Sequence, residues 1–210
     1  MDLYNMSLWQ LFLAGGAMMW PILACSVIAF GVIIERVCYL RRLKIDIHSL
    51  LSAVLDRVKH HQIKEALQVC EKTDHPVAHI LKAGILKYDR PRSQIKEAIE
   101  DVSLYEIPKL EKNIPVLATI AHISPLLGFL GTGVGMLRCF QVIQAKATLL
   151  RPVPVSDLAS GVWEALLTTI AGLLVAVPVF AAYNYLVSRV NGIILEMERA
   201  STELVNFLSE

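Results

Sequence analysis

Three polar side chains lie close together in an apolar stretch, and their types suit the handling of protons. Glu164, Thr168 and Thr169 fall within residues 161–184, where Glu164 is the single charged residue. A charge at the centre of a membrane helix costs about 2.5–3.5 kcal/mol or more, so such residues usually serve a function. A hydroxyl can both donate and accept a hydrogen bond. The pattern indicates a carboxylate that attracts or relays protons beside two hydroxyls. The alternative is a solvated carboxylate at the interface, near the outer face of the membrane that the helix spans.

A second apolar stretch, residues 113–137, carries Thr132 and His122 and no formal charge. The threonines of both stretches could instead bond to carbonyls of their own helices, as threonine often does in membranes. His122 could be a relay or a hydrogen-bonded core histidine. We expect no intramembrane lysine or arginine to pair with Glu164. Because threonine does not titrate at physiological pH, a complete proton path through these residues requires an acid from another chain.

Small residues recur at helical spacing in both stretches. Steps of three and four place residues on one face of a helix, and small side chains let membrane helices approach closely. We expect these faces to pack against helices or to line a pore, with the polar groups on or beside them. The residues are Gly128, Gly131 and Gly135 in the first stretch, and Ala165, Thr169, Gly172 and Ala176 in the second.

The composition is that of a chain lying partly in a membrane, with 55% hydrophobic and only 19% charged residues. A membrane-spanning helix needs about 20 apolar residues, and three such runs occur. We expect an all-α, polytopic inner-membrane protein whose three spans extend into a cytoplasmic helical bundle. The expected parts are an external N-terminus and first span (1–35, the span itself at about 11–34), a cytoplasmic region (36–112), a second span (113–145), a short external loop (146–157), a third span (158–189) and a cytoplasmic extension (190–210).

Charge sets the expected orientation, because lysine and arginine gather on the cytoplasmic side of a membrane. Fifteen of the 20 basic residues lie in 36–112 and three in 138–151. We therefore expect the N-terminus outside and the C-terminus in the cytoplasm. In the extension, apolar residues at steps of four and three predict a packed seam: Val190, Ile194, Met197, Ser201, Leu204 and Leu208, of which only Ser201 is polar. No stretch alternates as a strand would.

Several functional classes do not fit the sequence. A net charge of +1 argues against nucleic-acid binding. His75 and His79 stand four apart but lack cysteine or acidic partners at ligand spacing, so we expect a solvated helix start there and no metal. No cofactor motif or catalytic constellation is present, and we expect no enzyme. The absence of a detectable internal repeat argues against a solute transporter.

Three separated segments resemble one known family in the same order. LEKNIPVLATIAHISPLLGFLGTGVGM (110–136) and GVWEALLTTIAGLLVAVPVFAAYN (161–184) are similar to the two signature spans of the MotA/TolQ/ExbB proton-channel family. EALQVCEKTDHPVAHILKAGI (65–85) resembles the cytoplasmic part of the ExbB/TolQ branch. The resemblance covers nearly the whole chain. The chain departs from the family at Gly133, where the family has a bulkier apolar residue, and at His122.

The resemblance implies a homo-oligomer, a pentamer, around a dimer of a single-span ExbD/TolR-like partner that supplies an intramembrane aspartate. By resemblance, Thr132, Glu164 and Thr169 line the proton pathway, with Thr168 beside them. The implied activity converts the proton motive force into work on the cell envelope, with a TonB- or TolA-like protein as a further partner and lipid around the spans. A non-conducting scaffold and a flagellar-type stator are the alternatives.

Overall fold

The computed structural model describes residues 7–43, 45–148 and 154–208, and all regular elements among these residues are helices. This confirms the all-α prediction. The chain divides into two compact units. The first contains Met1–Ile34 and Asn113–Asn184, and the second contains Glu35–Lys112 and Tyr185–Glu210. Two helices, α2 (Met19–Arg42) and α8 (Val155–Leu208), contribute to both units.

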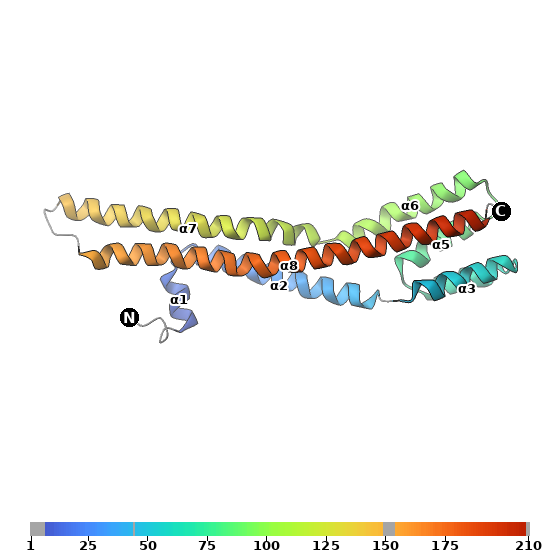
Figure 1. Ribbon diagram of the computed structural model, residues 1–210, viewed down its shortest axis with the longest axis horizontal. Helices are drawn as coiled ribbons and strands as arrows, with labels where there is room; N and C mark the ends of the chain where they lie inside the picture. Colours follow the sequence, from blue (N-terminus) through green and yellow to red (C-terminus); the bar gives the residue numbers. More distant parts are fainter. Residues whose placement is uncertain (1–6, 44, 149–153, 209–210) are drawn as a thin grey trace. The chain divides into compact units, whose positions relative to one another are not determined.

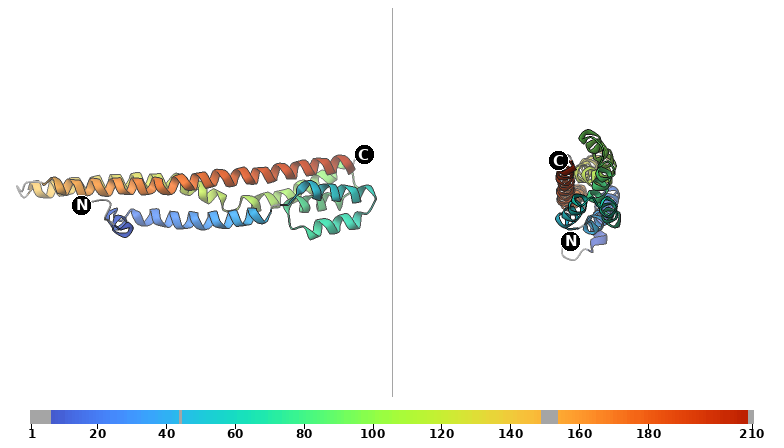
Figure 2. Two further views of the ribbon diagram at one scale, coloured as in Figure 1. Left: turned by 60° about the horizontal axis from the view of Figure 1, so that its bottom comes forward. Right: turned by 90° about the vertical axis from the view of Figure 1, so that its right-hand side faces the viewer.

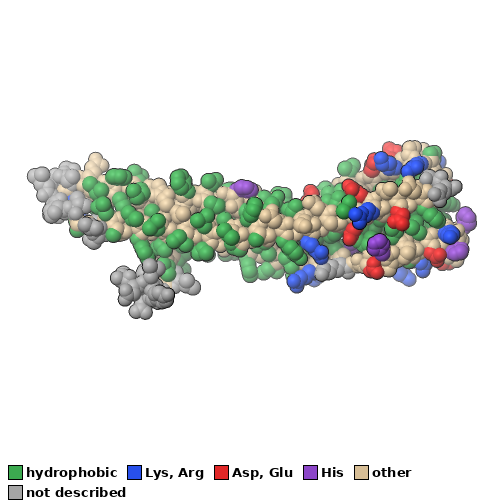
Figure 3. Space-filling model, in the orientation of Figure 1, with side chains coloured by type: hydrophobic (Ala, Val, Ile, Leu, Met, Phe, Trp, Pro, Cys, Tyr) green, Lys and Arg blue, Asp and Glu red, His purple; other side chains and the backbone are tan. Residues whose placement is uncertain are grey.

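The first unit contains the apolar helices. It consists of α1 (Leu8–Ala14), the beginning of α2, α7 (Ile114–Thr148) and the first part of α8 (Figure 1). Three segments are long and apolar enough to cross a membrane: Met19–Arg42, Arg92–Lys146 and Leu158–Leu208. The prediction of a three-span membrane protein is therefore confirmed. Figure 3 shows hydrophobic side chains covering α7 and the first part of α8, whereas charged side chains gather over the second unit.

The first apolar run is broken, whereas the sequence suggested one span from about residue 11. Helix α1 ends at Ala14 and α2 begins at Met19. Gly16 in the intervening turn has φ +70°, a left-handed conformation that glycine adopts without steric cost. Pro21 is the third residue of α2, where a missing N–H leaves no helical hydrogen bond unmade. Gly15, the C-cap of α1, and Gly16 thus end one helix, and Pro21 lies in the first turn of the next.

The second unit is a bundle of amphipathic helices. It contains α3 (Ile47–Lys59), α4 (Ile63–Lys72), α5 (Pro76–Ile85) and α6 (Arg92–Glu111), together with the end of α8. Gly84 of α5 has the side chains of Ile99 on α6 and Leu204 on α8 against it, so α5 is enclosed by both helices. The predicted seam of α8 is confirmed at Val190, Met197 and Leu204, each at most 2% exposed.

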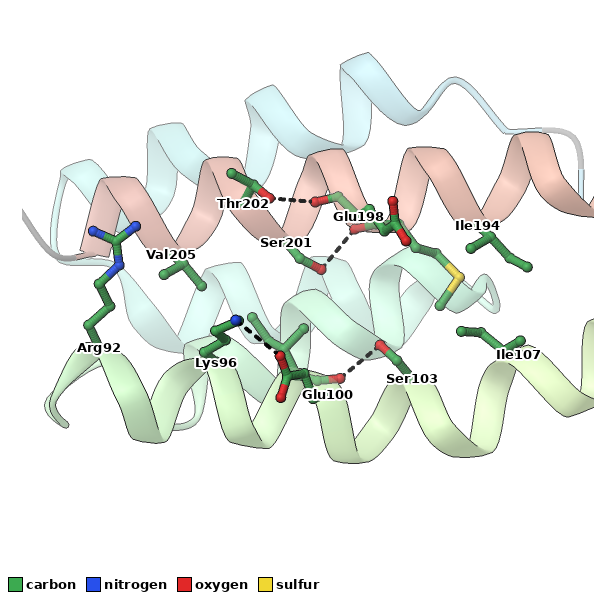
Figure 4. Close-up of a pocket in the computed structure, with 12 residues that line it drawn as sticks. Arg92, Lys96, Glu100, Ser103, Ile107, Ile194, Glu198, Ser201, Thr202 and Val205 are labelled. Carbon is green, nitrogen blue, oxygen red and sulfur yellow. Dashed lines mark hydrogen bonds and ion pairs between the residues drawn. The ribbon is translucent and has the colours of Figure 1, made fainter.

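A groove of about 640 Å³ lies between α6 and the end of α8 in the second unit (Figure 4). Ile99, Ile194 and Met197 contribute apolar surface to it. Charged side chains also line it, and Lys96 pairs with Glu100 at 3.3 Å. This exposed ion pair contributes little to stability.

Candidate functional site

The small-residue faces of α7 and α8 lie against each other within one chain. Figures 1 and 2 show α7 and the first part of α8 side by side. A Cβ atom added to Gly128 would lie 3.0 Å from the carbonyl oxygen of Thr168, and one added to Gly172 would lie 2.5 Å from that of Ser124. Gly135 faces Ala165 and the backbone of Gly161 in the same way. The two backbones are therefore in direct contact, as in other membrane helix pairs with small residues.

The three threonines of the candidate site lie in different environments. Thr168 is 1% exposed and packs against Gly131, whereas Thr132 and Thr169 are partly exposed. Thr168 donates to its own helix, at 2.9 Å from the carbonyl oxygen of Ala165. Thr169 Oγ1 lies 3.3 Å from the carbonyl oxygen of Gly128 on α7. The same oxygen lies 3.2 Å from the carbonyl oxygen of Ala165 in its own helix, so the single hydrogen of Thr169 can be donated either within α8 or across to α7.

The hydroxyl of Thr132 also bonds to the main chain. It lies 2.5 Å from the carbonyl oxygen of Phe129, one turn earlier in α7. Because a hydroxyl has a single hydrogen and two lone pairs, this bond leaves the oxygen of Thr132 able to accept. The same holds for Thr169. Both partly exposed threonines can therefore receive a hydrogen bond from a group on another chain.

Glu164 forms an ion pair with Arg138, contrary to the expectation that no basic residue would be available. The carboxylate of Glu164 accepts from Nη1 of Arg138. Arg138 directly follows the uncharged stretch 113–137, but α7 continues to Thr148 and places Arg138 opposite α8. The Glu164 side chain is 17% exposed and that of Arg138 48%. The geometry therefore provides a mostly buried carboxylate with a counter-charge.

His122 is hydrogen-bonded, as the core interpretation expected, but on the single chain it is exposed rather than buried. Its Nδ1 lies 2.6 Å from the carbonyl oxygen of Ala118 in the preceding turn. A carbonyl can only accept, so Nδ1 carries the hydrogen and Nε2 of the neutral ring is an acceptor. The ring meets Phe180 of α8 edge to face, with centroids 6.5 Å apart. The structure does not bring His122 into contact with the threonines or Glu164.

Sequence reasoning missed Ser124, which lies on α7 opposite Gly172. Its side chain is fully buried, and among the described residues its hydroxyl has no hydrogen-bond partner. An unsatisfied buried hydroxyl costs about 1–3 kcal/mol. Serine is small enough to belong to the packing face, and that size is the one signal in the sequence that could have identified it.

His75 begins a helix, as predicted, but it is not solvated. It caps α5, where its Nδ1 accepts from the backbone N–H of Val77 at 3.1 Å, and it is 1% exposed. Burial lowers the pKa of His75 below its ordinary value of 6.5, and the nearby His79 lowers it further. Among the described residues, no group of three or more His, Cys, Asp or Glu side chains is arranged to hold a metal ion.

Comparison with known proteins assigns the family. The profile of the MotA/TolQ/ExbB proton channel family matches residues 72–199. The biopolymer transport protein exbB1 of Vibrio cholerae is 30% identical over 86% of this chain and 79% of its own length. ExbB of Aquifex aeolicus is 34% identical over 56% of this chain and 76% of its own. The Tol-Pal system protein TolQ of Haemophilus influenzae is 39% identical over 50% of this chain and 46% of its own length. The chain therefore belongs to the MotA/TolQ/ExbB proton channel family, in its ExbB/TolQ branch.

Proposed function

We propose that this chain is the proton-conducting subunit of an envelope motor. In this proposal, several copies, five by family resemblance, form a ring around a single-span ExbD/TolR-like partner in the bacterial inner membrane. The N-terminus lies outside and the C-terminus in the cytoplasm. Protons that pass between ring and partner drive work on the envelope, either TonB-type import or Tol-type maintenance.

The observation that carries the proposal is the arrangement of polar groups where α7 and α8 pack. Glu164, Thr168 and Thr169 follow one another along one helix, and Thr169 Oγ1 lies within hydrogen-bond distance of two carbonyl oxygens, at 3.2 Å from that of Ala165 and at 3.3 Å from that of Gly128 across the contact. Burying a charged side chain inside a membrane costs free energy, so such residues usually serve a function. A carboxylate and partly exposed hydroxyls at a close helix contact are therefore suited to guiding protons.

The partner must contribute an acid in this mechanism, because the hydroxyls do not titrate. Thr132 and Thr169 each retain an acceptor oxygen, which suits a protonated carboxyl on a neighbouring span. Proton uptake neutralises that carboxyl and lowers its cost of facing an apolar wall. One charge moving across 100 mV is worth about 2.3 kcal/mol, which is comparable with the cost of placing a carboxylate in the membrane. A single proton can therefore bias one step of a motor.

The test is proton flux through the complete complex in proteoliposomes. We expect Thr169→Val and Glu164→Ala each to reduce flux at least about tenfold while the complex still assembles, since one lost transition-state interaction of about 1.4 kcal/mol corresponds to a factor of ten. Thr119→Val is the matched control, because Thr119 is an exposed threonine of α7 whose hydroxyl bonds to the carbonyl of Pro115 at 3.0 Å. Wild-type flux in both site variants would refute the proposal and favour a non-conducting scaffold.

A further inference from the structure

The turn between α1 and α2 contacts the Glu164–Arg138 pair. A Cβ atom added to Gly16 would overlap Oε1 of Glu164 and lie 3.3 Å from Nη1 of Arg138. The backbone of Gly16 therefore lies directly against the carboxylate of Glu164. Three segments that are distant in the sequence meet at this carboxylate: the turn, α7 and α8.

The turn can reach the pair only with glycine at this position. Gly16 has φ +70°, which other residues adopt at a cost, and no space for a side chain. Its N–H donates to the carbonyl oxygen of Leu13 at 3.2 Å, and its own carbonyl accepts from Met19 at 3.2 Å. These hydrogen bonds define the shape of the turn, and its position over the carboxylate depends on the contact with the ion pair.

Pairing with Arg138 and binding of a proton are alternatives for the same carboxylate. Guanidinium is always charged and binds the ionised form. A protonated Glu164 loses the charge that attracts Arg138. An ionised Glu164 without Arg138 is a mostly buried charge without a partner, which is strongly unfavourable. Among the described residues, Arg138 is the charged group that faces Glu164; the turn and the adjoining part of α2 place no charged side chain there. Proton binding at Glu164 must therefore be coupled to the position of Arg138.

We propose that Arg138 is the positioning residue that controls access of protons to Glu164, with the Gly16 turn as a cover held in place by the ion pair. When the ion pair between Arg138 and Glu164 opens, the Gly16 turn is released. The release of the turn then exposes the carboxylate of Glu164. Arg138 is 48% exposed and can swing away from α8, whereas Glu164 at 17% is confined. The role in proton access rests on the proposed function, but the coupling between pair and turn does not.

The coupling can be measured by hydrogen–deuterium exchange of the backbone amides of residues 15–19 in the full-length protein in nanodiscs. We expect Arg138→Gln to speed exchange about fivefold, which corresponds to the roughly 1 kcal/mol of a partly exposed ion pair. Arg138→Lys keeps the positive charge and should exchange as slowly as the wild type. Glu164→Gln should speed exchange as much as Arg138→Gln does, and the double variant Arg138→Gln/Glu164→Gln should exchange no faster than either single variant. Gly16→Ala should also speed exchange, whereas Gly31→Ala is the control, since a Cβ there meets no atom within 4 Å. Unchanged exchange in Arg138→Gln, or additive effects in the double variant, would overturn the coupling.

The second readout is the pH profile of proton flux through the complete complex. Because the guanidinium and the proton compete for the same carboxylate, the position of the pH profile should change in Arg138→Gln, while that of Arg138→Lys stays near wild type. A profile that keeps its position in Arg138→Gln would overturn the role of Arg138 in proton access. If the wild-type complex conducts no protons, the proposed function fails, and the exchange experiment still decides the coupling of pair and turn.

Discussion

Replacement of Gly172 by alanine tests whether backbone contact between α7 and α8 builds the candidate site. The added methyl group would lie 2.5 Å from the carbonyl oxygen of Ser124, and 3.2 Å and 3.3 Å from Cα and N of Gly128. These are main-chain atoms of α7, so no side chain can rotate to make room. Ordinary contact with a Cβ begins at 3.4 Å, so the two helices must separate locally by about 0.9 Å, the difference between these distances.

The cost of that separation can be worked out from its size. A gap of 0.5–1 Å forfeits about a quarter to a half of the dispersion energy of the contacts that line it. Overpacking of a tight site typically costs about 1–3 kcal/mol, and a rigid main-chain contact belongs at the upper end of this range. Alanine recovers at most about 1 kcal/mol through its better helix propensity. We therefore expect Gly172→Ala to lower the free energy of unfolding by about 1–2 kcal/mol.

The assay compares two glycines of the same helix. A Cβ on Gly192, also in α8, meets no atom within 4 Å, so Gly192→Ala should be neutral or stabilise the protein by up to about 1 kcal/mol. Unfolding of the full chain can be followed by the fluorescence of its three tryptophans during titration with denaturing detergent. The two variants should differ by about 1–3 kcal/mol, the sum of the two effects. Equal stability of the two variants would refute the packing argument.

Three further predictions concern single buried groups. His75→Asn keeps an acceptor for the Val77 N–H but cannot titrate. Because His75 has a lowered pKa in the folded state, wild-type stability should fall by up to about 1.4 kcal/mol per unit as the pH drops below 6.5, and denaturant titrations should find a flatter dependence in the variant. Burial raises the pKa of the Cys70 thiol to about 11, so alkylation of Cys70 at pH 8, followed by mass spectrometry, should be at least about 100-fold slower in the folded than in the unfolded chain; similar rates would contradict its burial. Ser124→Ala removes a buried hydroxyl without a described partner and should be neutral or stabilise the protein by up to about 1 kcal/mol in the detergent titration, whereas a clear loss of stability would show that the hydroxyl is satisfied.

Features that repeat along one helix could be predicted from the sequence. The spacing of Gly128, Gly131 and Gly135 defines a face without knowledge of what covers it, and the same holds for the α8 seam through Val190 and Leu204. Long uncharged runs likewise reveal spans, because the bilayer sets the length of helix that it requires. In each case the pattern lies within one segment of the sequence, so it can be recognised without knowing which helix packs against that segment.

Features that depend on where two helices meet could not be predicted. Arg138 follows an uncharged run, and its place opposite Glu164 depends on how far α7 continues and on how α8 returns beside it. The contact of Gly16 with Glu164 joins residues 148 positions apart in the chain. The exposure of His122 on the single chain could not be predicted either, because an apolar helix in a membrane protein can present its side chains to lipid or to another chain.

The placement of the hydroxyls bears on how much of a proton path one chain can hold. Thr132, Thr168 and Thr169 each bond to a main-chain carbonyl. To relay a proton, each hydroxyl would have to break its own bond and turn, and the oxygens would have to follow one another at hydrogen-bond distance. Among the described residues, no hydroxyl–hydroxyl bond joins these threonines. On the proposed function, the threonines therefore orient a titrating group rather than conduct, and the group that moves the proton past them belongs to the partner. A partner span in which every acid is replaced by its amide should therefore abolish flux while Thr132 and Thr169 remain intact.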